Sequence, residues 1–216
     1  MKYRPNCLRG RITCSRLGED NYHSQRSFDF EEYQSGEYFN WGPVITINDD
    51  RSQQGFVTAY HEHKGLDILS YVVEGTVQHH DNLGNDLTAY AGQVQHMSCG
   101  TGIWHTESNP GPLANRYLQI WIQPNGYNPQ WTPQYTLVDR LPGFALLPVE
   151  LKNTRLRIHA GVLAGVHSVD AWSYLLVLEG SCRVEDLELA EGDSLDITRA
   201  CEIQGQGAHL LLFTHV

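Results

Sequence analysis

The sequence predicts an all-β protein built from two related units. Its 216 residues include 20 glycines and 9 prolines spread along the chain, a composition typical of short strands joined by tight turns. With 41% hydrophobic residues, the chain can bury a substantial core. A spacing of glycines in the first half recurs in the second half, which indicates that one β unit is repeated.

The strands are expected to begin late in the chain. The opening thirty residues are polar and predict irregular structure, whereas residues 44–47 predict a strand that a turn at residues 48–50 ends. Further strands are expected at residues 56–63, 67–73, 76–80 and 87–90. The turns between them are marked by glycine, asparagine and aspartate. Hairpins at this spacing are typical of a small barrel.

A change in composition divides the chain after residue 123. The following segment is rich in proline and asparagine, which is unusual for an element of a core. We therefore expect an N-terminal domain at residues 1–123, a linker at 124–134 and a shorter C-terminal domain at 135–216.

Two pairs of metal-type ligands lie in the first domain. In a strand, side chains at positions i and i+2 point to the same face, so His61 and His63 can aim at one point while Glu62 points away. The same argument applies to His105 and Glu107. If the two strands are neighbours in a barrel, three imidazoles and one carboxylate converge on a single cation and leave positions open for water or substrate.

The second unit is expected to lack these ligands. Gly75 and Gly92 of the first unit correspond to Gly180 and Gly192 of the second. An ungapped count from the second pair of glycines finds none of the four ligand types, but instead Val166, Ser168, Gly205 and Gly207. We interpret the C-terminal domain as one without metal ligands.

The ligand types indicate which metals suit the site. Imidazoles with one carboxylate bind Fe(II), Mn(II), Ni(II), Co(II), Cu(II) or Zn(II), and the absence of thiolates argues against a closed structural zinc site. Among the other histidines, His79 and His80 precede a turn rich in Asp and Asn and are expected to be solvated.

Charge and cysteine content exclude several classes of partner. The formal net charge is -10 and the 15 basic residues form no dense run, so direct nucleic-acid binding is not expected. The five cysteines form no C-x-x-C pair, which is typical of reduced thiols and a cytoplasmic protein. The polar N-terminus and the lack of a stretch of about 20 apolar residues predict no membrane partner.

Three segments together resemble the signature of the pirin family of the cupin superfamily: residues 61–75, 81–85 and 91–107. The resemblance covers most of residues 25–123, whereas the second half matches in outline. It implies a bicupin, two jelly-roll-type β-barrels packed together, with one metal, usually iron, bound by His61, His63, His105 and Glu107. This sequence departs from the family at Glu62, where proline is common, and at Asp67, where glutamate is usual.

The resemblance also implies two classes of function. Several pirins are similar to quercetinases, which open the central ring of a flavonol such as quercetin with dioxygen and release carbon monoxide; Glu107 would then be the catalytic base. The alternative is a non-enzymatic iron-dependent redox sensor that binds a protein partner such as a transcription regulator. A cupin with another small-molecule activity stays open, because fold does not fix function.

Overall fold

The computed structural model describes residues 1–16, 19–140 and 142–216, without the side chains of residues 14–20. In these ranges the chain forms nineteen β-strands and one short 3-10 helix, η1 (Asn6–Leu8), so the predicted all-β class is confirmed. No helix within them is long and apolar enough to cross a membrane. Contacts divide the chain into two compact units. The histidine unit comprises Gly10–Asp139 and Val149–Thr154, and the leucine unit comprises Met1–Arg9, Arg140–Pro148 and Arg155–Val216.

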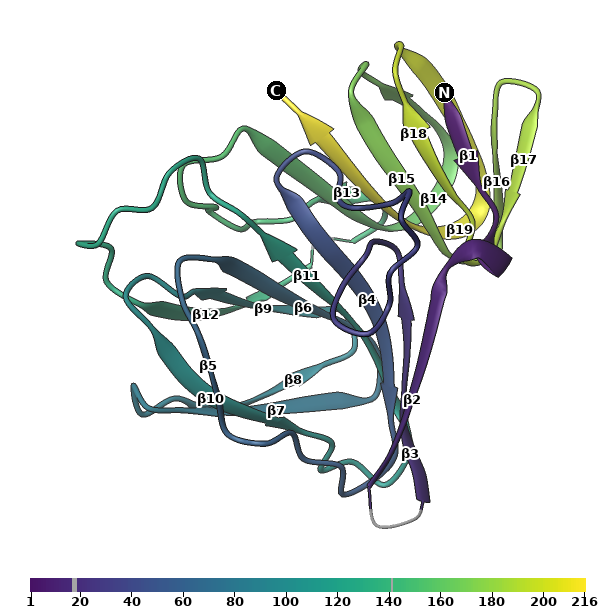
Figure 1. Ribbon diagram of the computed structural model, residues 1–216. Coiled ribbons are helices and arrows are strands. Elements are labelled where there is room, and N and C mark those ends of the chain that lie inside the picture. Colours follow the sequence, from purple (N-terminus) through teal and green to yellow (C-terminus); the bar gives the residue numbers. More distant parts are fainter. Residues whose placement is uncertain (17–18, 141) are drawn as a thin grey trace. The chain divides into compact units, whose positions relative to one another are not determined.

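The histidine unit is built from two antiparallel sheets, which face each other (Figure 1). The larger sheet has seven strands, in the order β12 (Gln134–Asp139), β9 (Gln93–Ser98), β6 (Asp67–Glu74), β11 (Asn115–Ile122), β4 (Val44–Ser52), β3 (Glu19–Arg26) and β2 (Gly10–Arg16). The smaller sheet has four, in the order β5 (His61–His63), β10 (Ile103–Ser108), β7 (Thr76–Asp81) and β8 (Asp86–Tyr90).

The strand prediction was wrong in three places. Gly10–Arg16 and Glu19–Arg26 form β2 and β3, not irregular structure, and β4 continues through the expected turn at residues 48–50. These strands were missed because polar residues such as Ser24 and Arg26 are buried on them, so no apolar alternation marks them. The strand expected at 56–63 is confined to His61–His63, preceded by an isolated bridge between Val57 and Ser108.

The leucine unit is a single antiparallel sheet of eight strands. Its main path runs β1 (Lys2–Arg4), β18 (Ser194–Ile197), β15 (Ser173–Glu179), β19 (Cys201–His215), β14 (Leu156–Val169) and β13 (Ala145–Leu146). Two further strands form a hairpin against β19, namely β16 (Ser181–Val184) and β17 (Leu187–Ala190).

The internal repeat is confirmed at the level of single turns. Gly75 (φ 70°) joins β6 to β7, and Gly180 (φ 74°) joins β15 to β16 in the leucine unit. Gly92 precedes β9 and donates its N–H to the carbonyl of Val72 (2.9 Å), while Gly192 precedes β18 and donates to Val177 (2.8 Å). Both units therefore use the same glycine turns, in a region of φ that favours glycine.

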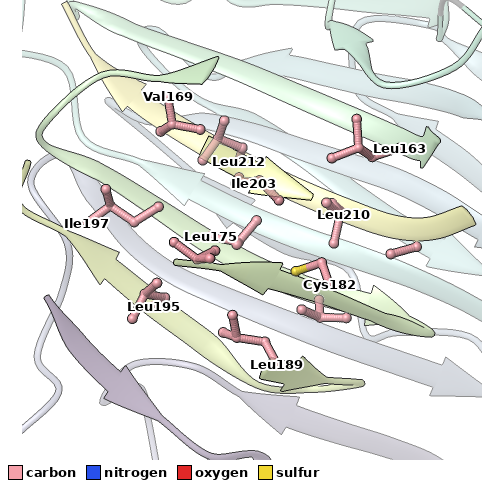
Figure 2. Packing of buried hydrophobic residues seen from close by; sticks show 13 residues of the cluster. Leu163, Val169, Leu175, Cys182, Leu189, Leu195, Ile197, Ile203, Leu210 and Leu212 are labelled. Carbon is pink, nitrogen blue, oxygen red and sulfur yellow. The ribbon is translucent and has the colours of Figure 1, made fainter. Parts of the chain in front are cut away.

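The leucine unit has an apolar interior, shown in Figure 2. Leucine, valine and isoleucine side chains from β14, β15, β18 and β19 converge there, together with Cys182 of β16. On β14, Leu163 and Val169 share strand parity and both lie in the buried cluster. Val166 has the opposite parity and is 59% exposed. The ungapped count therefore selected an outward-facing position of the second unit.

The division by contacts differs from the expected domain limits at both ends. Strand β1 pairs with β18, so Met1–Arg9 belongs with the leucine unit. Strand β12 pairs with β9 along its whole length, so the residues up to Asp139 belong with the histidine unit. The proline-rich segment after residue 123 thus leads into a further strand of the same sheet.

Candidate metal centre

Three histidines meet on the inward face of the smaller sheet. Strand β5 pairs antiparallel with β10 so that His61 lies opposite His105 and His63 lies opposite Ile103. The ring centroids of His61 and His105 are 4.5 Å apart, and those of His63 and His105 are 5.0 Å apart. One ligand nitrogen from each of the three rings falls within 4.8 Å of the others. The predicted convergence of these histidines is therefore observed.

The hydrogen bonds of these rings indicate which nitrogens face the centre. His61 Nδ1 lies 2.7 Å from the carbonyl of Ala59, so it is a donor and leaves Nε2 with its lone pair. The Nε2 atoms of His63 and His105 are buried and have no hydrogen-bond partner among the described residues. Buried polar atoms without partners are costly. A divalent cation bound by the three Nε2 atoms would satisfy them, so the residues fit a metal.

Burial keeps the imidazoles of His63 and His105 in the neutral form that binds metals. It lowers the pKa of His63 to about 4, with a further lowering by the neighbouring His61. Burial also lowers the pKa of His105 to about 2, and the surrounding histidines add to this. Protons therefore do not compete for the nitrogens near neutral pH.

Glu107 is buried beside this cluster. Its ligand atom falls within 4.8 Å of those of His105 and His79, a second group distinct from the three histidines. The Glu107 carboxylate accepts hydrogen bonds from Ser70 Oγ (3.0 Å) and Gln119 Nε2 (2.7 Å). Burial raises the pKa of Glu107, although the nearby histidines and these two hydrogen bonds act in the opposite direction.

Trp121 fixes the orientation of the Gln119 side chain, which donates a hydrogen bond to Glu107. Its indole N–H can only donate, and it does so to Gln119 Oε1 at 3.0 Å. The amide of Gln119 must therefore turn Nε2 toward Glu107. The Trp121 ring also packs edge-on against His63, at 4.7 Å between centroids. One tryptophan thus contacts a histidine of the cluster and orients the hydrogen bond to Glu107.

The prediction for His79 was wrong. His80 is exposed as expected, but His79 is fully buried and lies opposite Glu107 in the β7–β10 pairing. Its Nδ1 lies 3.3 Å from His105 Nδ1, and its Nε2 lies 2.9 Å from Asp81. Strand parity contained the signal, because the apolar Val77 two residues earlier already faces inward.

The residues next to the candidate ligands in sequence, Glu62 and Trp104, point away from the histidine cluster, as parity predicts. Glu62 and Trp104 lie opposite each other on the outer face of β5 and β10, and Trp104 is 41% exposed. Trp104 packs near the exposed ring of Tyr60, at 5.6 Å between centroids. The departure from proline at position 62 therefore does not reach the histidine cluster.

The family model described as Pirin matches residues 10–122, more than half of the chain. This chain belongs to the pirin family. A putative quercetin 2,3-dioxygenase of Zymomonas mobilis is 34% identical to this pirin over 79% of its chain and 80% of the relative. The quercetin 2,3-dioxygenase of Escherichia coli K12 is 33% identical over 82% of each chain.

Solved structures support the same assignment. The bacterial pirin YhhW of Escherichia coli, in complex with nickel(II), matches with a TM-score of 0.86 and 28% identity, over 98% of this chain and 97% of the other. A match over the full length, together with the repeated glycine turns, confirms the predicted bicupin class. This pirin therefore has a candidate metal site at His61, His63 and His105, and a relative that was solved with a divalent metal.

Proposed function

We propose that this pirin is a metal-dependent dioxygenase that opens the central ring of a flavonol such as quercetin. The observation that carries the proposal is the pair of buried Nε2 atoms of His63 and His105, which have no partner among the described residues. Relatives named quercetin 2,3-dioxygenase support the substrate class. Iron(II) is the proposed metal, and the same donors also suit nickel, manganese, cobalt, copper or zinc.

In this proposal His61, His63 and His105 hold the metal and Glu107 completes the set as a fourth ligand. A bound divalent metal supplies Lewis-acid stabilisation of negative charge on the flavonol 3-oxygen. The carboxylate of Glu107 needs a modest rearrangement of its hydrogen bonds to join all three histidines, because it groups with His105 but not with His61 and His63.

Glu107 is also the proposed base that takes the proton of the flavonol 3-hydroxyl. A carboxyl group whose pKa is raised by burial accepts a proton more readily than a solvated one. Ser70 and Gln119 hold the two carboxylate oxygens at separate points, so either oxygen can keep its partner while the other takes the proton. The apolar cluster of Ile68, Met97 and Ile103 packs against Trp121 and limits water on one side.

The test measures metal and turnover in one preparation. The protein is purified without a histidine tag, its metals are quantified by plasma mass spectrometry, and quercetin absorbance is followed under air and under nitrogen. We expect oxygen-dependent loss of quercetin that scales with metal content and is abolished in His61→Ala. Glu107→Gln should abolish turnover, whereas Glu62→Gln, a matched change on the outer face of β5, should leave it intact.

Two results would contradict the proposal. Full activity in Glu107→Gln would exclude the base. A protein with stoichiometric metal and no turnover of any flavonol would instead favour the redox sensor with a protein partner. That alternative is then tested by whether oxidation of the metal changes the affinity for the partner.

A further inference from the structure

A buried chain of hydrogen bonds leads from His105 through His79 to Asp81. His105 Nδ1 lies 3.3 Å from His79 Nδ1, and the other nitrogen of His79 lies 2.9 Å from Asp81 Oδ2. The side chains of His79 and Asp81 are both fully buried. The chain therefore connects the candidate metal centre to the turn that follows β7.

That turn supplies Asp81 with donors on both carboxylate oxygens. Oδ1 accepts from the backbone N–H groups of Leu83 (2.9 Å) and Asn85 (3.0 Å), and Oδ2 accepts from Asn85 Nδ2 (2.8 Å) as well as from His79. Gly84, at φ 92°, allows the tight return of the chain. Burial by itself would raise the pKa of Asp81, but the hydrogen bonds from His79, Asn85 and Leu83 outweigh it and lower the pKa. Asp81 is therefore a fixed, ionised acceptor.

An ionised acceptor at one end fixes the protons along the whole chain. Because Asp81 can only accept, His79 Nε2 must carry the proton in their hydrogen bond. In a neutral imidazole the other nitrogen is then an acceptor, so His79 Nδ1 accepts from the N–H at His105 Nδ1. His105 Nε2 is left with its lone pair, and this is the buried atom without a partner among the described residues.

The His79 ring is held in place by an aromatic neighbour. Tyr135 of β12 stacks on it, with 4.2 Å between the ring centroids and an angle of 19° between the planes. The opposite arrangement, in which a proton sits on His105 Nε2, would leave that nitrogen without a lone pair for a metal. The contacts therefore favour one orientation of His79 and one tautomer of His105.

We propose that His79 and Asp81 are positioning residues that fix His105 as the tautomer protonated on Nδ1 and so set the metal affinity of the site. The turn from Asp81 to Asn85 thereby acts on the metal through His79 and His105. Hydrogen bonds to the free nitrogen of a metal-bound imidazole commonly contribute about 10- to 100-fold in affinity. The inference rests on the metal site of the proposed function but not on the reaction.

The experiment titrates metal-free protein with cobalt(II) against a competing chelator and records the visible absorption of the complex. His79→Ala should weaken cobalt binding by about 10- to 100-fold and change the cobalt spectrum. His79→Gln should recover part of the affinity, since its amide can accept from His105 and donate to Asp81. His80→Ala, the matched change at the neighbouring exposed histidine, should bind cobalt like the wild type.

Asp81→Asn separates the proton argument from simple packing. The side chain keeps its shape, but an amide N–H facing His79 Nε2 would reverse both tautomers and place the proton on His105 Nε2. We expect a loss of cobalt affinity at least as large as that of His79→Ala. Nitrogen-15 NMR of the metal-free protein should show His105 protonated at Nδ1 in the wild type and at Nε2 in the variant. Urea unfolding checks that each variant folds.

Several outcomes would overturn the proposal. Cobalt affinity in His79→Ala equal to that in His80→Ala would remove the positioning role, as would wild-type His105 protonated at Nε2. Two cobalt ions per chain, one of them lost in His79→Ala, would make His79 a ligand of a second ion beside Glu107. A wild-type chain that binds no cobalt would overturn the metal site itself, whereas failure of quercetin turnover alone would leave this inference standing.

Discussion

The two units share their glycine turns and have opposite interiors. In the leucine unit, β14 and β19 pair along their length with one register shift, and the space they enclose is filled with aliphatic side chains. In the histidine unit, the corresponding pairing is split between β4 with β11 and β5 with β10. The inward face there carries buried polar groups such as Asn48, Ser70 and Gln95. The same β scaffold is therefore used twice, and its inward-facing residues determine whether the interior is an apolar core or a polar site.

The largest expected effect is a loss of stability in the leucine unit without a loss of metal. Leu175 is fully buried in the apolar cluster, so Leu175→Ala should cost about 2–5 kcal/mol of unfolding free energy. Urea unfolding measures this, with Val162→Ala at a 43% exposed position of β14 as the control. Loss of metal from the folded variant would contradict the separation of the two interiors.

Metal removal should act on the other interior. Metal at 100 times its dissociation constant stabilises the state that binds it by about 2.7 kcal/mol. We expect calorimetry to show this shift in the transition that includes the histidine unit, and chelation to reverse it. His61→Ala is the control, and it should unfold identically with and without metal. An equal shift in that variant would place the metal elsewhere.

The polar interior should also show a pH dependence that Asp50 causes. Burial raises its pKa from 3.8 to about 7, although hydrogen bonds and the charge of Arg26 act against this. The folded state then holds a proton that the unfolded chain releases, so the stability from Asp50 is full below pH 3.8 and is lost as the pH rises through 7. For one proton the slope is about 1.4 kcal/mol per pH unit.

Asp50→Asn should remove this dependence. The unfolding free energy of the wild type minus that of the variant should decrease from pH 4 to pH 7 and then level off, because only the wild type loses a proton over this range. Asp186→Asn, an exposed change in the leucine unit, is the control and should leave the profile unchanged. Parallel profiles for wild type and Asp50→Asn would show that Asp50 is already ionised in the folded state.

The smallest effect is a difference in the reactivity of two thiols. Cys99 lies in the histidine unit and Cys182 in the leucine unit, and burial raises the pKa of each to about 12. Both are free thiols, as the sequence predicts, whereas the side chain of Cys14 lies outside the described part of the chain. In variants that keep only Cys99 or only Cys182, with the other cysteines replaced by serine, the rate of thiol labelling measures how often that unit opens. Metal should slow labelling of Cys99 but not of Cys182, and equal slowing would mean that the units open together.

Strand parity placed His61 and His63 on one face, and the resemblance to the pirin family added the expectation that His105 joins them. His61, His63 and His105 each lie one residue from an outward-facing neighbour, and the register of β5 with β10 brings them together as expected. The same rule applied to Val77 would have found His79. The turn rich in Asp and Asn that follows β7 predicts solvation, and it obscures the parity of the strand that precedes it.

Other features depend on information that the local sequence does not carry. A register shift in the pairing of β14 with β19 skips Gly207, so the buried cluster takes Ile203 before it and Leu210 after it, which differ in strand parity. An ungapped count from a glycine does not contain such a shift. The edge strand β2 pairs with its neighbour β3, and polar side chains such as Ser24 and Arg26 are buried on β3, so no hydrophobic period marks this pair of strands.

Strand β1 has a consequence for how the protein is made. Its Tyr3 hydroxyl donates to Asp193, a partner 190 residues later, and the strand itself pairs with β18. At about 5–20 residues per second, a ribosome needs roughly ten to forty seconds to release that partner. The histidine unit can meanwhile fold from a nearly contiguous stretch. Residues 2–4 are thus synthesised well before the strand with which they pair, and a truncation that removes them would act on the completion of the leucine unit.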